Sequence, residues 1–336
     1  MKSNFTLTSP SVLGAEEEYS ALDNDTVNSR SSLWCYFARD LKLTVTFSFM
    51  CVVCIFGLVG NGAVIWLLGF CMKRTPFTTY ILNLAVADLG VLIAIPVLYI
   101  IECNVMDGFY FLISTDAVQT FIQFMYSVSQ FLLTSISIDR CVSVLFPLWH
   151  RCHRPKNFST ILCALIWILC FLLNGILISL HLLAILVSLS PSFYVFFVNA
   201  VLCLPLISLS TLILLSQVCC KAQMRHRGKL LIVILLSLFF FLTLAFPMNV
   251  ILLINFTVWN TSFNSYCLIL CGLLCTSLNS FVNPLLYFLV GRKKRGLCRE
   301  NLKLILQRVF IEEEVHREEL EASIRALHYH FPLPQN

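Results

Sequence analysis

Charged residues are scarce in this chain of 336 residues: Asp, Glu, Lys and Arg together make up 12% of it, whereas 58% is hydrophobic. Soluble domains carry about 25% charged residues, and a soluble chain this apolar could not cover its own surface with polar groups. The scarcity excludes a soluble protein and indicates an integral membrane protein. Lys and Arg lie mainly in short clusters between apolar runs, a distribution that argues against nucleic-acid binding.

Other absences exclude further classes. No period-2 alternation is present, which argues against a membrane β-barrel, and no matching inverted halves are present, which argues against a transporter. The sequence contains 16 cysteines, but most lie inside apolar runs, where a thiol is a small hydrophobe, and no paired-cysteine metal motif occurs in a polar loop. The polar, acidic N-terminus has no early apolar core, so we expect the first hydrophobic helix to serve as an uncleaved insertion signal.

What the sequence does contain is seven long apolar runs. Each run exceeds the ~30 Å hydrocarbon core at about 1.5 Å of helical rise per residue. The runs cover residues 43–71, 77–101, 117–146, 158–187, 193–220, 229–257 and 265–290. We therefore predict an all-α fold, a seven-transmembrane helix bundle over residues 43–291. Residues 1–42 form a polar segment before it, and residues 292–336 form a short amphipathic eighth helix with an acidic tail.

The distribution of Lys and Arg predicts the orientation. Basic residues occur in the first, third and fifth connections and after the seventh run, while the second, fourth and sixth connections have none. The positive-inside rule then places the N-terminus outside the cell and the C-terminus in the cytosol. Asn4 and Asn24 lie in N-glycosylation motifs on the outer side. The eighth helix is expected to lie along the inner leaflet, in contact with membrane lipids, with Cys298 as a palmitoylation site.

The third run carries an adjacent ion pair, Asp139 and Arg140, just before its end at Pro147. Ionisable residues inside a membrane are costly and mark functional positions. The basic segment beyond Pro147 belongs on the cytosolic side. We therefore expect Arg140 to be available to a cytosolic partner.

A second polar group lies deeper in the bundle. Asp88 of the second run can meet Ser129 of the third and Asn279 and Asn283 of the seventh. Carboxylate, hydroxyl and amide oxygens are ligands for a small hard cation. Two interpretations stay open, an allosteric sodium site and a polar network without an ion. No other cofactor and no other metal site is expected.

Signature residues occur on every run in order: Gly60-Asn61, Leu84 to Asp88, Asp139-Arg140-Cys141, Trp167, Pro205, Pro247 and Asn283 to Tyr287. With these residues the chain resembles a rhodopsin-class (class A) G-protein-coupled receptor. The segments Arg74 to Thr78, Ser137 to Cys141 and Phe146 to Lys156 are similar to those of the Mas-related receptors.

The resemblance implies a function at the plasma membrane. An extracellular agonist would activate the receptor, which would couple to a heterotrimeric G protein, and a sensory role of the itch or nociception kind follows from the subfamily. The resemblance assigns G-protein coupling to Asp139, Arg140, Cys141, Pro147 and Leu148. It assigns the activation switch to Asn61, Pro205, Phe241, Ala245, Pro247, Asn283, Pro284 and Tyr287.

Some positions depart from the family pattern. Ala245 replaces the usual tryptophan before the proline of the sixth helix, and Arg227 stands where an acidic partner of Arg140 is often found. We therefore expect Arg140 to be held mainly by Asp139, in a loosely restrained resting state with measurable basal signalling.

The ligand-binding residues are expected near the outer ends of the helices: Glu102, Asp116, Leu177 and His181. Because residues 174–197 contain no acid, one hypothesis is a shallow, apolar pocket for a lipid-like or neutral ligand near Leu177. The other is a cationic peptide bound by Glu102 and Asp116. Alternatives to a coupled receptor are a signalling-dead or scaffold seven-helix receptor and an ion or proton transporter. No nucleophile with a base or metal converges, so an enzyme is not expected.

Overall fold

Helices account for the regular structure of the chain wherever it is described. The computed structural model describes residues 44–72, 74–103, 108–146, 154–155, 157–182, 191–220, 232, 234–244 and 265–291, and no strand occurs among them. The chain forms two compact units, Met1–Met50 and Cys51–Asn336. The described part of the first unit is the beginning of the first helix; all other described elements belong to the second unit.

Among the residues just named, six helices are long and apolar enough to cross a membrane, and a shorter apolar helix spans Ile234–Leu244. The first span, Thr44–Cys71, ends in the short π-helix η1 (Leu67–Cys71). The labelled helices are α2 (Pro76–Cys103), α3 (Gly108–Leu145), α5 (Phe158–Leu182), α6 (Pro191–Cys220) and α8 (Ser265–Gly291). They fall on the predicted runs, so the all-α membrane bundle is confirmed.

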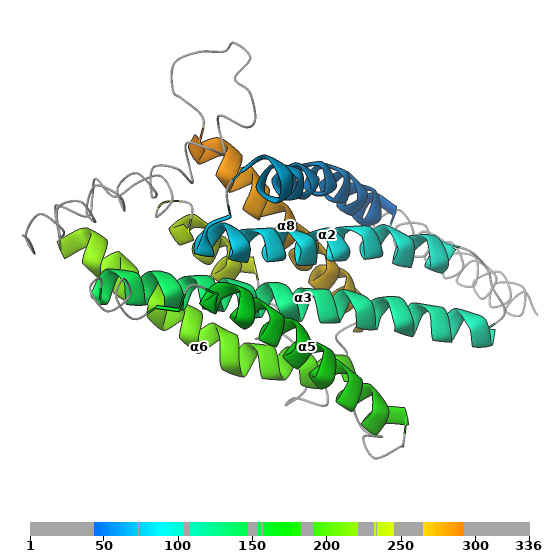
Figure 1. Ribbon diagram of the computed structural model, residues 1–336. Helices are drawn as coiled ribbons and strands as arrows, with labels where there is room; N and C mark the ends of the chain where they lie inside the picture. The colour runs from blue at the N-terminus through cyan, green and yellow to red at the C-terminus, as the bar shows by residue number, and fades with distance from the viewer. Residues whose placement is uncertain are drawn as a thin grey trace, which may run out of the picture. The chain divides into compact units, whose positions relative to one another are not determined.

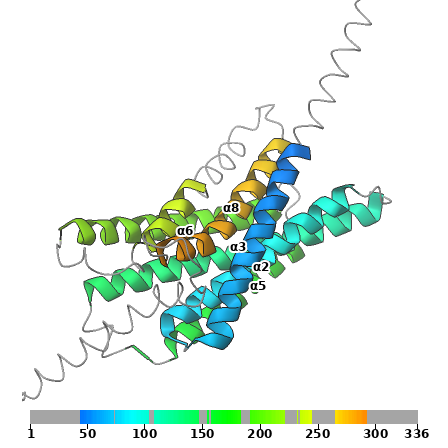
Figure 2. The same cartoon turned by 90° about the horizontal axis from the view of Figure 1, so that it is seen from above.

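The helix α3 is the central element of the second unit. It packs against α2, α5 and α6, while α2 also packs against α8 (Figure 1). In the most apolar part of α3, 67% of the residues are buried inside the protein, compared with 22% for α5. Both Figure 1 and Figure 2 show α8 running beside residues 51–66 of the first helix. Side chains placed on α3 can therefore meet partners from three neighbouring helices.

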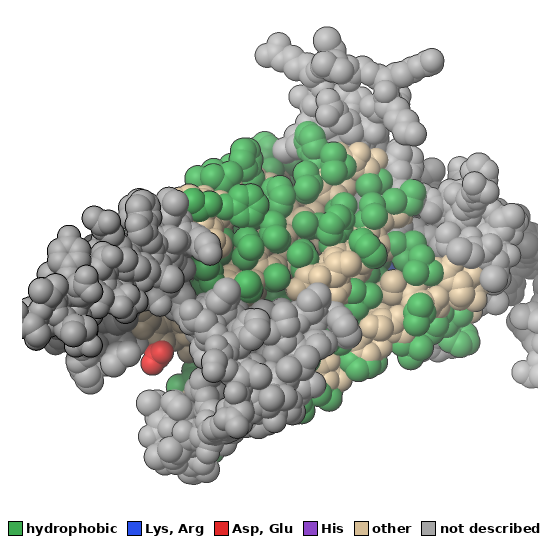
Figure 3. All heavy atoms as spheres, turned by 180° about the vertical axis from the view of Figure 1, so that it is seen from behind, with side chains coloured by type: hydrophobic (Ala, Val, Ile, Leu, Met, Phe, Trp, Pro, Cys, Tyr) green, Lys and Arg blue, Asp and Glu red, His purple; other side chains and the backbone are tan. Residues whose placement is uncertain are grey.

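Much of the described surface of the helices is hydrocarbon. Figure 3 shows hydrophobic side chains over much of the described part of one face. On α5, Phe171 is 67% exposed, and Ile161, Leu165 and Ile168 are each 56% exposed. An apolar surface of this extent indicates contact with lipid rather than water.

One boundary differs from the prediction. The third apolar run was expected to begin at residue 117, but α3 begins at Gly108. Ser114, Thr115 and Asp116 lower the hydropathy of this stretch, yet they lie within the helix. Hydropathy measures preference for lipid, and a helix can continue beyond the part that prefers lipid.

Candidate functional site

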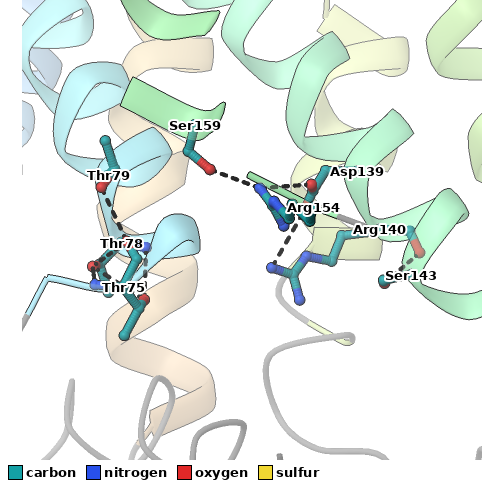
Figure 4. Close-up of polar contacts among 8 residues, drawn as sticks. All are labelled: Thr75, Thr78, Thr79, Asp139, Arg140, Ser143, Arg154 and Ser159. Carbon is teal, nitrogen blue, oxygen red and sulfur yellow. Dashed lines mark hydrogen bonds and ion pairs between the residues drawn. The ribbon is translucent and has the colours of Figure 1, made fainter. Parts of the chain in front are cut away.

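The charged cluster consists of Asp139, Arg140 and Arg154. Asp139 and Arg140 lie less than two turns before the end of α3, and Arg154 lies just ahead of α5. Their side chains are only 8–13% exposed. Figure 4 shows the three side chains directed toward one another. The cluster joins α3 to the segment that precedes α5.

The two arginines hold the carboxylate of Asp139 unequally. Nη2 of Arg154 lies 2.9 Å from Oδ1, whereas Nη2 of Arg140 lies 3.6 Å from Oδ2. The shorter distance is that of a charge-assisted hydrogen bond, and the longer one exceeds hydrogen-bonding range. The sequence had suggested Asp139 as the main partner of Arg140; in the structure the carboxylate is bound more closely by Arg154.

Arg154 also contacts the beginning of α5. Its Nη2 donates to Oγ of Ser159 at 2.6 Å, and Ser159 is buried. The guanidinium group therefore bridges α3 and α5 (Figure 4). In the sequence, the basic residues of this segment indicate only the orientation, and nothing in the local pattern identifies Arg154 as the partner of Asp139.

Arg140 lies against an aromatic ring of α2. Its guanidinium carbon is 4.1 Å from the ring centroid of Phe77, a cation–π distance, and Phe77 is buried.

The start of α2 is fixed by a reciprocal cap. The backbone N–H of Thr75 donates to Oγ1 of Thr78 at 2.7 Å, and the N–H of Thr78 donates to Oγ1 of Thr75 at 3.2 Å (Figure 4). Pro76 supplies a preset φ for the first turn. The cap thus fixes the first turn of α2, to which Phe77 belongs.

The buried polar cluster consists of Asp88, Ser129 and Asn283. Oγ of Ser129 donates to Oδ1 of Asp88 at 2.9 Å, and Nδ2 of Asn283 donates to Oδ2 at 2.8 Å. All three residues are 3% exposed or less. The structure therefore brings together three of the four residues predicted around a cation. Asn279 is buried as well, and its amide nitrogen has no hydrogen-bond partner among the described residues.

The chemistry of this cluster fits a small hard cation. Asp88 provides two carboxylate oxygens, Ser129 a hydroxyl oxygen, and Asn283 an amide oxygen that its bond to Asp88 does not use. Ser129 and Asn283 also satisfy the carboxylate by themselves, as expected for the alternative of a polar network. Both interpretations from the sequence are compatible with this geometry.

Asn61 and Pro284 form a second link between helices. Proline has no N–H, so Pro284 leaves the carbonyl of Ser280, four residues earlier, without its helical donor. Nδ2 of Asn61 donates to that carbonyl at 3.1 Å and to the carbonyl of Gly57 at 3.0 Å. The Asn61 side chain therefore replaces the missing helical bond and joins the first helix to α8.

A small cavity lies between the charged cluster and the buried polar cluster. It is lined by Phe77, Ile81, Leu133, Ile136, Ile234, Ser237, Leu238 and Tyr287. These residues come from α2, α3, the helix Ile234–Leu244 and α8. Phe241 of the same short helix is fully buried in the hydrophobic core. At this cavity, the side chains of four helices do not completely fill the space between them.

Several predicted site residues lie outside the described part of the chain: Asn4, Asn24, Pro147, Leu148, Ala245, Pro247 and Cys298. The helices α2 and α5 include Glu102 and His181, whose side chains are likewise outside it. Asp116 is exposed on α3, and Leu177 is half-buried on α5. Cys141 is buried near the charged cluster, and Pro205 lies inside α6.

Comparison with known proteins adds independent information. Residues 60–184 match the family described as the 7 transmembrane receptor (rhodopsin family). The proto-oncogene Mas of Rattus norvegicus is 37% identical over 266 residues, which cover 76% of this chain and 81% of the relative. Mas-related G-protein coupled receptor member H of Rattus norvegicus is 38% identical over 269 residues, 79% of this chain and 83% of the relative. Member D of Homo sapiens is 36% identical over 274 residues, with coverage of 77% and 83%.

The chain belongs to the Mas and Mas-related group of rhodopsin-family receptors. It is a G-protein-coupled receptor by family and not an enzyme. It is also a multi-pass protein of the plasma membrane, in agreement with its apolar helices. For a receptor of this family, the charged cluster and the buried polar cluster are the two sites whose chemistry requires explanation.

Proposed function

We propose that this receptor is activated by an extracellular agonist and couples to a heterotrimeric G protein through Arg140. The observation that carries the proposal is the position of Arg140, a buried residue near the end of α3 whose guanidinium group pairs with the neighbouring carboxylate of Asp139 at 3.6 Å. A cation held in this way can change partner when the helices move. Activation is then a shift of population between two helix packings.

The orientation belongs to the same proposal. The basic connections would face the cytosol, so that Arg140 and the residues after α3 meet the G protein, while the N-terminus lies outside. A sensory role of the itch or nociception kind is the physiological setting that the subfamily suggests. Cys141, Pro147 and Leu148 are proposed to complete the G-protein contact.

The test of coupling is guanine-nucleotide exchange without added agonist. Membranes containing the receptor are incubated with a panel of purified heterotrimeric G proteins and a non-hydrolysable GTP analogue. We expect at least one heterotrimer to exchange faster than on receptor-free membranes, and Arg140→Gln at matched surface expression to abolish the difference. Exchange that is unchanged by Arg140→Gln would refute the proposed role of Arg140.

The ligand class is proposed as two alternatives. An apolar or lipid-like agonist would contact Leu177, whereas a cationic peptide would pair with Asp116 and Glu102. The half-buried Leu177 and the exposed Asp116 are compatible with both. Once an agonist is in hand, loss of its response in Asp116→Asn would select the peptide, and an unaffected response would select the apolar ligand.

A further inference from the structure

Arg140 has contacts with Asp139 and with Phe77 among its partners. On one side is Asp139. Its Oδ1 lies 2.9 Å from Nη2 of Arg154, and its Oδ2 lies 3.6 Å from Nη2 of Arg140, so the two arginines share the carboxylate. On the other side is the ring of Phe77, at 4.1 Å from the guanidinium carbon. A cation–π contact gains strength when the cation is removed from water. Because the Arg140 side chain is only 11% exposed, the Phe77 contact is one of the strengthened kind.

The same phenylalanine borders the cavity where the helix Ile234–Leu244 meets α2, α3 and α8. Ile234 and Leu238 of that helix line this cavity together with Phe77. Movement of the helix away from α3 would enlarge the cavity and remove packing from the ring. Phe77 thus contacts the cation and lines the same cavity as the helix Ile234–Leu244.

We propose that Phe77 is a positioning residue that holds Arg140 in the resting packing, so that an aromatic ring on α2 sets the basal activity of the receptor. The ring does not contact the G protein in this proposal; it acts through Arg140. The inference rests on the proposed function, because only a coupled receptor has a basal activity to restrain. It differs from the expectation that Asp139 is the main restraint on Arg140.

The test compares two phenylalanines that each contact an arginine. Phe77→Leu keeps an apolar side chain but removes the ring from Arg140. Phe158→Leu is the matched control, because Phe158 is an exposed residue whose ring centroid lies 5.7 Å from the guanidinium carbon of Arg154. Basal nucleotide exchange is measured as above, at matched surface expression. We expect Phe77→Leu to raise it by about thirtyfold, the population change that loss of a desolvated cation–π contact gives. Phe158→Leu should leave it unchanged.

Two further variants separate restraint from simple loosening of the bundle. Phe77→Tyr keeps an aromatic face and should return exchange to the wild-type level. The double variant Phe77→Leu/Arg140→Gln should fall to the level of receptor-free membranes, because the ring acts through the arginine. The inference would be overturned if basal exchange stayed raised in the double variant. It would also be overturned if Phe77→Tyr raised basal exchange as much as Phe77→Leu does.

The outcomes also distinguish the two proposals. If wild-type exchange exceeds that of Arg140→Gln but Phe77→Leu matches the wild type, the aromatic restraint is refuted and coupling through Arg140 stands. If neither the wild type nor Phe77→Leu exceeds receptor-free membranes on any heterotrimer, both proposals fail together.

Discussion

Single polar side chains make the links between helices that hydrocarbon cannot make. Asp88 binds side chains from α3 and α8, Asn61 binds a carbonyl of α8, and Nε1 of Trp167 donates to Oδ1 of Asn83 at 3.1 Å. In membrane proteins each such bond contributes about 0.6 kcal/mol on average. The individual bonds are weak, but each has a defined geometry, so together they select one packing of the helices among many apolar ones.

At this scale we predict that sodium stabilises the receptor through Asp88. The melting temperature of the purified protein should be higher in sodium chloride than in potassium chloride at equal concentration. We expect a difference of about 2–4 °C, which corresponds to about 1 kcal/mol of stabilisation by the bound ion. Asp88→Asn preserves the side-chain volume but removes the charge, so the difference should vanish.

The measurement can use the receptor's own thiols, because Cys54, Cys163, Cys170 and Cys203 are buried and free and become reactive on unfolding. A wild-type protein equally stable in both salts would exclude the ion and leave the polar network as the interpretation. A sodium effect that persists in Asp88→Asn would place the ion elsewhere.

Pairs of helices approach closely where a side chain is missing. At Gly60, an added Cβ would lie 3.0 Å from both Cβ and Cγ of Pro284. The proline ring is rigid and cannot move aside by rotation, as a leucine side chain could. The glycine therefore permits the first helix and α8 to come near enough for Asn61 to reach the carbonyl of Ser280.

We predict that Gly60→Ala destabilises the receptor by about 1–3 kcal/mol, the usual cost of overpacking. The added methyl group should separate the first helix from α8 and lengthen the bond from Asn61. Gly62→Ala is the control on the same helix, since an added Cβ there meets nothing within 4 Å. Thermal unfolding should show a lower melting temperature for Gly60→Ala only. Equal melting temperatures for the two variants would show that the contact with Pro284 is not close in the native protein.

The helices were predictable from the sequence, and the reason is physical. A membrane-spanning segment must satisfy its backbone internally and present hydrocarbon to lipid, so length and apolarity are sufficient signals. The start of α3 was not predictable in this way, because Ser114 to Asp116 continue the helix without continuing the apolar run. The composition of a segment indicates where its contact with lipid ends. It does not indicate where the helical hydrogen bonding of its backbone ends.

The site was predictable in part. Asp88, Ser129 and Asn283 could be grouped because few polar residues lie inside the apolar runs, and such residues need one another. Phe77 and Arg154 could not be found, because an aromatic residue at a helix start and an arginine in a basic segment are both ordinary there. Only the packing of α2 and α5 against α3 shows that Phe77 lies against Arg140 and that Arg154 binds the carboxylate of Asp139.

At the scale of the whole molecule, the proposed orientation predicts which asparagines carry glycans. Asn4 and Asn24 should be glycosylated, because they precede the first span on the outer side. Asn157 also lies in an acceptor motif, and it is exposed just before α5, but this connection is proposed to face the cytosol. It should therefore carry no glycan, although the asparagine itself is exposed.

The check is electrophoretic mobility before and after enzymatic removal of N-glycans. Asn4→Gln and Asn24→Gln should each increase the mobility of the untreated receptor, and the double variant should no longer respond to the enzyme. Asn157→Gln should run like the wild type. A mobility change in Asn157→Gln, with none in the other two, would reverse the proposed topology.

The sparse packing of α5 has a practical consequence for purification. This helix has the smallest buried share of the six long apolar spans, and it presents bulky side chains outward along most of its length. Outside the bilayer, a surfactant micelle must replace the acyl chains along this helix in particular. Short, harsh surfactants can insert beside α5 and separate it from α3, which would break the bridge through Arg154. Extraction in a mild, long-chain surfactant supplemented with a sterol should therefore preserve the charged end of the molecule best.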